Sequence, residues 1–214
     1  VTGHPAFMDK LPTFWAVKSD VHVSRELTTS RGPGTSFEFA ITLSEQLLGE
    51  SVANDLRNYY FNEDEGPYST GEQWNINHQP RVLIPIANGA GLVETVAITD
   101  ILRRANVDVV ISSVEDSPRI CDSQGIKIVA DNSILEAANS THDVILLVCP
   151  PRCESLKQIV EDQRRCGRIS LSLENKGGVA SVTNFALEIV RRFYGEKRAA
   201  SVAEGLAYRR AFMS

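Results

Sequence analysis

The sequence is poor in cysteine and in basic charge and has no long apolar run, and each shortage excludes a class of protein. Only 4 of its 214 residues are cysteine, which is too few for a disulfide-stapled secreted scaffold. Lys and Arg number 22 against 27 Asp and Glu, a net charge of -5, so no basic face for nucleic acid is expected. The longest apolar run, 144–149, has the length of a strand and not the roughly 18 residues of a membrane span.

These shortages favour an intracellular protein with reduced thiols that binds neither nucleic acid nor membrane. The chain begins at Val1, without methionine, and its first residues do not resemble a signal peptide. We therefore expect further sequence, and any targeting peptide, to precede it. Hydrophobic residues make up 43% of the chain, enough to favour an ordered globular fold.

The second part of the chain alternates between apolar strands and helices. Strands are predicted at 81–86, 107–114, 126–130, 144–148 and 169–173, and helices at 91–105, 133–139, 153–165 and 179–194. In helix 91–105 the predicted inward residues are Val93, Val96, Ile101 and Leu102. Nearly continuous apolar strands are typical of a parallel sheet that is buried on both faces. The pattern therefore predicts an α/β fold with helices on both faces of the sheet.

The first part of the chain has a different pattern. Residues 13–18 and 21–29 alternate apolar and polar side chains around Ser19-Asp20, which predicts a β-hairpin. The segment Arg31-Gly32-Pro33-Gly34 predicts a turn. Helices follow at 35–48 and 51–61. The polar, aperiodic residues 62–80 are predicted to be a linker.

The end of the chain repeats the end of its first part. Phe39, Gly49 and Ala53 recur as Phe185, Gly195 and Ala199, each 146 residues later. This offset is about one domain long. We therefore predict that residues 1–61 are the C-terminal part of one domain and that residues 81–208 are a second, internally shortened domain. In helix 35–48 one face is predicted to carry the apolar residues Phe39, Leu43, Leu47 and Leu48. Helix 179–194 has a matching apolar stripe, so the two helices would compete for one groove, where we expect helix 179–194 to pack.

Three segments resemble one known family. They are Val82–Ala105, Thr28–Ala40 with its Ser-Arg-Gly-Pro-Gly-Thr-Ser-Phe-Glu-Phe run, and Val1-Thr2-Gly3-His4-Pro5. All three are similar to the DJ-1/PfpI (ThiJ) family, whose fold is flavodoxin-like and related to class I glutamine amidotransferases. Two copies in one chain resemble the tandem members of this family in plants. The resemblance implies a plastid or cytoplasmic location and a homodimer.

The resemblance also implies a site chemistry. Family members carry a cysteine nucleophile on a strand-to-helix elbow, a glutamate that hydrogen-bonds it, a nearby histidine and an oxyanion hole of glycine amides. Their activities include glutathione-independent glyoxalase and deglycase reactions on small reactive carbonyl compounds, in oxidative-stress response and without a cofactor. Glu94 matches the glutamate and His4 the histidine, although His4 belongs to the first copy. From the residues alone, Glu94 could equally be an ordinary helix-start acid and His4 a solvated side chain.

The sequence departs from the family pattern at the nucleophile. The elbow cysteine should fall near Leu173, and no cysteine is there. The loop Cys149-Pro150-Pro151-Arg152 replaces the family's Pro-Gly-Gly, and a proline nitrogen has no hydrogen to donate to an oxyanion. Cys149 and Cys153 are alternative redox candidates by position, while their spacing does not form a metal site. We therefore expect an inactive descendant of carbonyl-handling enzymes, or alternatively a non-catalytic scaffold, chaperone-like or partner-binding protein.

Overall fold

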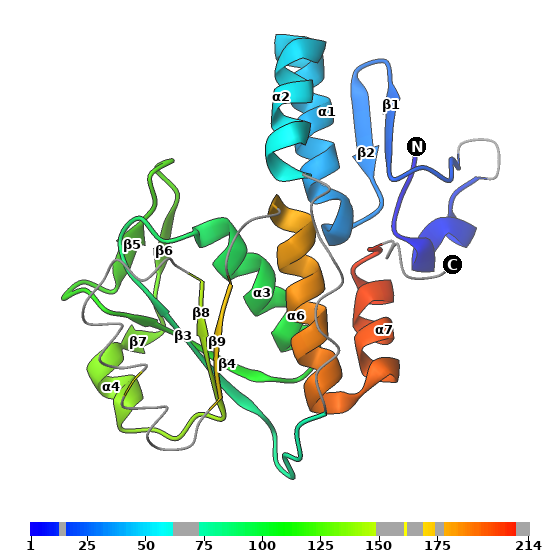
Figure 1. The fold of residues 1–214 in the computed structure, drawn as a ribbon. Coiled ribbons are helices and arrows are strands. Elements are labelled where there is room, and N and C mark those ends of the chain that lie inside the picture. The colour runs from blue at the N-terminus through cyan, green and yellow to red at the C-terminus, as the bar shows by residue number, and fades with distance from the viewer. Residues whose placement is uncertain (13–15, 62–72, 149–160, 162–168, 174–177, 209–214) are drawn as a thin grey trace. The chain divides into compact units, whose positions relative to one another are not determined.

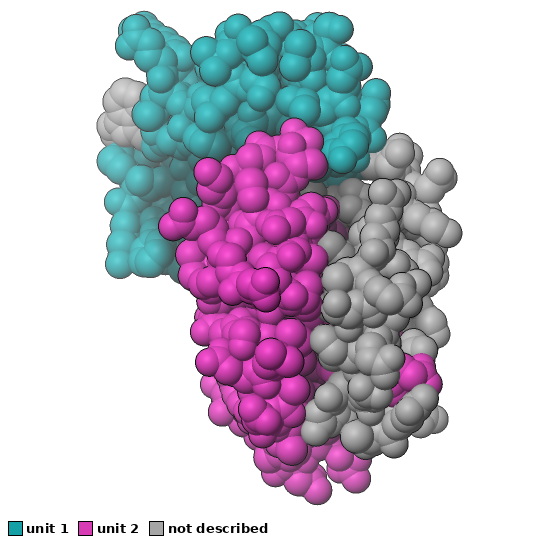
Figure 2. Space-filling view, turned by 90° about the vertical axis from the view of Figure 1, so that its left-hand side faces the viewer, with its two compact units in different colours: residues 1–63, 196–214 teal, residues 64–195 magenta. Residues whose placement is uncertain are grey.

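The computed structural model describes residues 1–12, 16–61, 73–148, 161, 169–173 and 178–208. The chain divides into two compact units, which Figure 2 shows in different colours. Unit 1 comprises residues 1–63 together with 196–214, and unit 2 comprises residues 64–195. Unit 2 is thus inserted between the two stretches of unit 1, and each unit is described by itself below.

Unit 2 is built on a parallel five-stranded sheet. Its strands are β7 (Asn132–Ser133), β4 (Asp108–Ser113), β3 (Arg81–Ile86), β8 (Val144–Leu147) and β9 (Ile169–Ser172), in that spatial order. β3 pairs with β4 along its whole length, from Arg81 opposite Asp108 to Ile86 opposite Ser113. Five of the six residues of β3 are buried, because a central parallel strand is covered on both faces. The predicted α/β fold is therefore confirmed.

Helices cover both faces of this sheet (Figure 1). α3 (Leu92–Arg104) and α6 (Gly178–Tyr194) pack against each other on one face. On the other face α4 (Ile134–Ala138) packs on the strands through Ala137, which shares a cluster with Leu83 and Ile145. Successive strand residues point to opposite faces, so each strand supplies both layers. The predicted helix 153–165 lies almost wholly outside the described residues.

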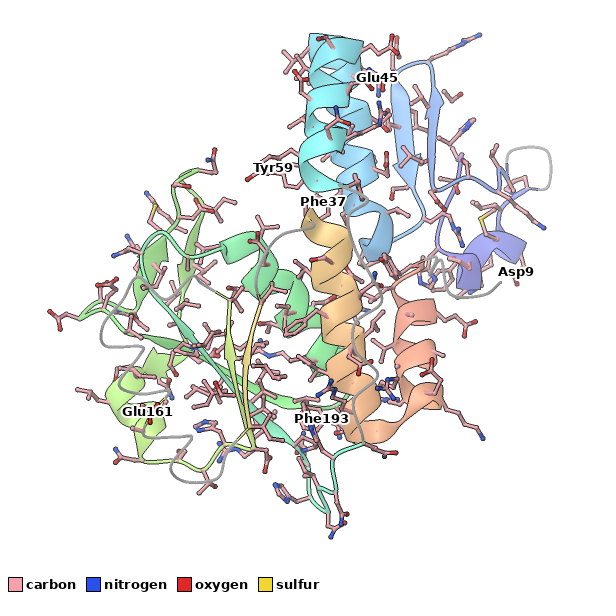
Figure 3. All side chains as sticks on the ribbon, in the orientation of Figure 1. Asp9, Phe37, Glu45, Tyr59, Glu161 and Phe193 are labelled. Atoms are coloured by element: carbon pink, nitrogen blue, oxygen red, sulfur yellow. The ribbon has the colours of Figure 1, made fainter. Side chains whose placement is uncertain are left out.

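A second, smaller sheet in unit 2 is only half anticipated by the sequence. β5 (Arg119–Cys121) pairs antiparallel with β6 (Lys127–Val129). The prediction of a strand at 126–130 is confirmed, but β5 has no apolar periodicity long enough to reveal it. The end of the predicted linker is also fixed in this unit. The Trp74 N–H donates to the Arg192 carbonyl at 2.7 Å, and the Trp74 ring lies 4.8 Å from that of Phe193, which Figure 3 labels.

Unit 1 contains a hairpin and helices. Its elements are η1 (Pro5–Lys10), β1 (Val21–Ser24), β2 (Leu27–Ser30), η2 (Pro33–Thr35), α1 (Ser36–Leu48), α2 (Glu50–Tyr60) and α7 (Glu196–Gly205). The predicted position of the hairpin was wrong. The turn lies at Arg25-Glu26, where Arg25 has φ 55°, and Val21 pairs with Ser30.

The predicted turn residues have another role at the base of this hairpin. The Asp20 carbonyl accepts the Arg31 N–H at 3.0 Å, and the Asp20 carboxylate pairs with the Arg31 guanidinium at 2.7 Å. Asp20 therefore closes the open end of the hairpin. A short alternating pattern predicts a strand pair, but it does not show which two residues form the turn.

The predicted inward faces of two helices were also partly wrong. α1 buries Ile41, while Leu47 and Leu48 on the predicted apolar stripe are 80% and 66% exposed. In α3 the predicted inward residues Ile101 and Leu102 are buried, but Val96 is 52% exposed. The period of the pattern identifies a helix correctly, whereas the face that is covered depends on what packs there.

The repeat that the sequence shows has a structural counterpart. α1, Gly49 and α2 form a helix–glycine–helix unit, and α6, Gly195 and α7 form another with the same offset of residues. The two glycines have φ 92° and 84°, a region that glycine adopts without strain. Ala53 and Ala199 are both 0% exposed. None of the described helices is long and apolar enough to cross a membrane.

Candidate functional site

The candidate site of unit 2 lies at the carboxyl ends of its parallel strands. The strand order reverses between β3 and β8, since the chain first places β4 on one side of β3 and then β8 on the other. Ligands of open α/β sheets bind beside such a reversal, beyond the carboxyl ends of the strands. The loop 87–91 after β3 and the first turn of α3 therefore form one wall of the candidate site.

Hydrogen bonds hold this loop in a fixed conformation. The Asn88 N–H donates to the Glu115 carboxylate at 3.0 Å, and the Asn88 side-chain oxygen accepts the Cys121 N–H at 3.0 Å. The Gly89 N–H donates to the Cys121 carbonyl at 2.9 Å. Gly89 has φ 80°, which a side chain would strain. The loop is thus fastened both to the loop after β4 and to β5.

Glu94, which the resemblance matches to the family glutamate, follows the 87–91 loop. It is half-buried in the first turn of α3, and its carboxylate folds back over Gly91. A Cβ on Gly91 would come within 2.5 Å of the Glu94 Oε2, so the glycine leaves room for this arrangement. Thr95, which is 0% exposed, donates its hydroxyl to the Gly91 carbonyl at 2.9 Å. The Glu94 carboxylate therefore lies beside Gly91 at the carboxyl edge of the sheet, and its role in catalysis stays a prediction.

The position of the expected nucleophile is taken by an apolar side chain. Leu173 follows β9 directly, and its N–H continues the ladder to the Leu147 carbonyl at 2.8 Å. Its side chain is buried, with 5% exposure. A leucine side chain has no lone pair with which to attack a carbonyl carbon. At the two positions where the family has its glutamate and its cysteine, the carboxyl edge of this sheet thus carries Glu94 and Leu173.

The other sulfur candidates are not all described. Cys149 and Cys153, together with Pro150 and Pro151, lie outside the described residues. The thiol that the structure does describe is Cys121, half-buried, with its Sγ 3.5 Å from the Asp122 carbonyl. Sequence reasoning missed its position beside the 87–91 loop, because nothing in the pattern revealed β5. Among the described residues, no group of three His, Cys, Asp or Glu side chains could hold a metal ion.

His4 lies in unit 1, whereas Glu94 lies in unit 2, so the structure does not bring them together within one unit. The His4 Nδ1 accepts the Ala6 N–H at 3.3 Å and caps η1. Its Nε2 lies 3.2 Å from the Gly205 carbonyl. Both ring nitrogens of the half-buried His4 thus have backbone partners in unit 1, and the catalytic role that the resemblance implies for it stays a prediction.

Comparison with known proteins agrees with this architecture. Residues 80–164 match the model of the DJ-1/PfpI family. Over 153 residues the chain is 38% identical to protein DJ-1 homolog B of Arabidopsis thaliana, covering 68% of this chain and 35% of that protein. Protein DJ-1 homolog A of the same plant is also 38% identical, over 154 residues, which cover 68% of this chain and 39% of that protein. The chain thus spans between a third and two fifths of the length of these relatives.

Solved structures show the same fold. Oxidized Toxoplasma gondii DJ-1 superposes with a TM-score of 0.54 at 21% identity, covering 61% of this chain and all of that one. Drosophila melanogaster DJ-1beta gives a TM-score of 0.55 at 17% identity, covering 62% of this chain and all of that one. The fold is therefore of the flavodoxin-like, class I glutamine amidotransferase-like type. The chain belongs to the DJ-1/PfpI family.

Proposed function

We propose that this chain descends from the glutathione-independent glyoxalases and deglycases of its family and is itself inactive towards small reactive carbonyl compounds. The observation that carries the proposal is the buried Leu173 at the carboxyl end of β9. Covalent catalysis on an aldehyde needs an activated nucleophile that adds to the carbonyl carbon. Glu94 keeps the position of a proton acceptor in that chemistry, but there is no thiol at Leu173 from which it could accept a proton.

The proposal extends to domain organisation. Residues 1–61 are the C-terminal part of a first family domain, 62–80 are a linker, and 81–208 are a shortened second domain. The repeated helix–glycine–helix unit supports this tandem arrangement. Kinship with two plant proteins at 38% identity supports a plant-type member, and hence a plastid or cytoplasmic protein that forms a homodimer.

A second candidate function is non-catalytic partner binding. The observation that favours it is the apolar surface on α1 and α2 of unit 1. Leu47, Leu48 and Tyr59 are 80%, 66% and 75% exposed, and Figure 3 labels Tyr59 on α2. Leu47 and Leu48 lie at one end of the helix pair and Tyr59 at the other, beside Phe37, so the exposed apolar side chains are spread along the pair. Exposed apolar surface is a feature of interaction sites.

We expect the purified chain to produce no D-lactate from methylglyoxal above the rate of a heat-denatured sample. The physical reason is the missing nucleophile at position 173. The measurement is an enzymatic D-lactate assay on the full chain and on its Cys149→Ser, Cys153→Ser and Cys121→Ser variants. Turnover by the full chain that one of these substitutions abolishes would contradict the proposal and assign catalysis to that cysteine.

A further inference from the structure

The four residues at the end of α7 lie against a glycine-rich turn of unit 1. We call Gly205–Tyr208 the tail, and His4, Gly32 and Gly34 the glycine seat. The Gly34 N–H donates to the Leu206 carbonyl at 2.7 Å. The His4 Nε2 lies 3.2 Å from the Gly205 carbonyl. Two backbone carbonyls of the tail are thus paired with two groups of the seat.

The fit between tail and seat depends on glycine. A Cβ on Gly34 would lie 2.8 Å from the Leu206 carbonyl oxygen and 2.9 Å from the Tyr208 Cα. A Cβ on Gly32 would lie 3.3 Å from the Ala207 Cβ. Leu206 and Ala207 are only 3% and 4% exposed. The close approach of two backbones therefore leaves no room for side chains at Gly32 and Gly34.

The tail has the conformation of a helix end. The Tyr208 N–H donates to the Ala203 carbonyl at 3.0 Å, and Ala207 has φ 56°. This bonding satisfies some carbonyls of the last turn, while others need partners outside the helix. The seat supplies two such partners. The Gly34 N–H, in the turn that leads into α1, donates to the Leu206 carbonyl, and the His4 ring lies beside the Gly205 carbonyl. A helix C-terminus thus meets a helix N-terminus, and their dipoles attract.

The repeat offset shows which copy supplies the tail. Shifting Gly205–Tyr208 back by 146 residues places it at positions 59–62, which are the last two residues of α2 and the two that follow them. The described aromatic residues among these have contacts or exposure elsewhere. The Tyr60 ring packs 5.4 Å from that of Phe37, and Tyr59 is 75% exposed. The turn of the first copy is therefore filled by the end of the second copy.

We propose that the glycine seat is a docking site for a helix C-terminus, and that the tail of the second repeat occupies it in cis, so that unit 1 is a composite of both repeats. The unit boundary at Gly195-Glu196 supports this, because it separates α7 from α6 at a glycine with φ 84°. Recognition is through backbone carbonyls and a small residue facing Gly32. The proposal does not depend on the carbonyl chemistry of unit 2.

The test is amide hydrogen exchange on the full chain and its Gly34→Ala variant. We expect the amides of 196–208 to exchange at least about tenfold faster in Gly34→Ala, because the added methyl group displaces the tail. The matched control is Gly3→Ala, which has room for the methyl group because the nearest atom to an added Cβ lies 3.8 Å away. Exchange of residues 196–208 should be unchanged in Gly3→Ala. Exchange in β3 of unit 2 should be unchanged in both variants.

Unchanged exchange of residues 196–208 in Gly34→Ala would overturn the proposal. If Gly34→Ala loses protection throughout unit 1, the milder Gly32→Ala variant decides, since its contacts of 3.2–3.4 Å loosen the tail without unfolding. Unchanged amide exchange of residues 196–208 in Gly32→Ala would contradict the proposal. A dilution series tests whether the tail binds the seat of its own chain. Light scattering gives the oligomeric state at each concentration, and hydrogen exchange gives the protection of the tail. Loss of tail protection as a dimer dissociates would show that the tail comes from a second copy, against the proposal.

Discussion

Leu102→Ala is expected to lower the free energy of unfolding of unit 2 by about 3 kcal/mol, in the usual range for a buried leucine. Leu102 is 0% exposed on α3, the helix that packs against α6 beside the central strands. Removing its isobutyl group loses apolar burial and leaves a cavity that the surrounding structure fills only in part. Urea denaturation followed by Trp74 fluorescence measures the effect. A Trp15→Phe background leaves Trp74, which packs on Phe193, as the single indole.

The matched control for this prediction is Val96→Ala on the same helix. Val96 is 52% exposed, so its truncation should change the free energy of unfolding by no more than about 0.5 kcal/mol. Equal losses in the two variants would contradict the assigned faces of α3. A small loss in Leu102→Ala alone would contradict the burial of that helix against the sheet layer.

Glu188→Gln is expected to lower the free energy of unfolding of unit 2 at neutral pH by about 2 kcal/mol. The Glu188 side chain, 12% exposed, accepts hydrogen bonds from Arg191 at 2.6 and 2.7 Å and from Arg192 at 3.1 Å. Burial raises the pKa of Glu188, but the hydrogen bonds and charges of the two arginines outweigh it and hold the pKa below its usual value. Replacing the carboxylate weakens both charge-assisted pairs.

The pH dependence of this effect has a definite sign. Because the pKa of Glu188 is lowered in the folded chain, its carboxylate stabilises the fold at any pH above the pKa of the unfolded chain, near 4.5. That stabilisation is lost as the pH falls through the lower pKa of the folded chain. The gap between the wild-type chain and Glu188→Gln should therefore close in acid. Asp100→Asn, which breaks the exposed Asp100–Arg104 pair on α3, is the control and should cost little at any pH. A constant gap down to acid pH would contradict the assigned role of the arginines.

The parallel sheet could be predicted because its strands carry continuous apolar runs. Helices cover both faces of the sheet that is formed by β3, β4, β8 and β9. A strand that is buried on both faces is apolar along its whole length, and this sequence pattern does not depend on the pairing register. The signal fails where pairing is short. β5 has three residues, and the β1–β2 turn at Arg25 lacks the glycine or asparagine that would identify it.

The candidate site was predictable in part, for a topological reason. Leu173 directly follows one parallel strand, and Glu94 lies in the first turn of the helix after another. Strand ends and the starts of the helices that follow them lie at the carboxyl edge of the sheet, so the edge on which both residues lie could be predicted. The contact of Cys121 with the 87–91 loop depends on pairing across an unpredicted hairpin. One partner of His4, the Gly205 carbonyl of the tail, lies 201 residues further along the chain. Local patterns contain no information on such distant contacts.

The central proposal is that no nucleophilic thiol serves the carboxyl edge of the unit 2 sheet. The most direct measurement is the alkylation rate of each of the 4 cysteines by iodoacetamide at pH 6, resolved by peptide mass spectrometry. At this pH an ordinary thiol is almost wholly protonated and reacts slowly, whereas an activated catalytic thiolate reacts fast. We predict that no cysteine reacts faster than free cysteine. One that reacts at least about a hundredfold faster, and is protected by methylglyoxal, would contradict the account.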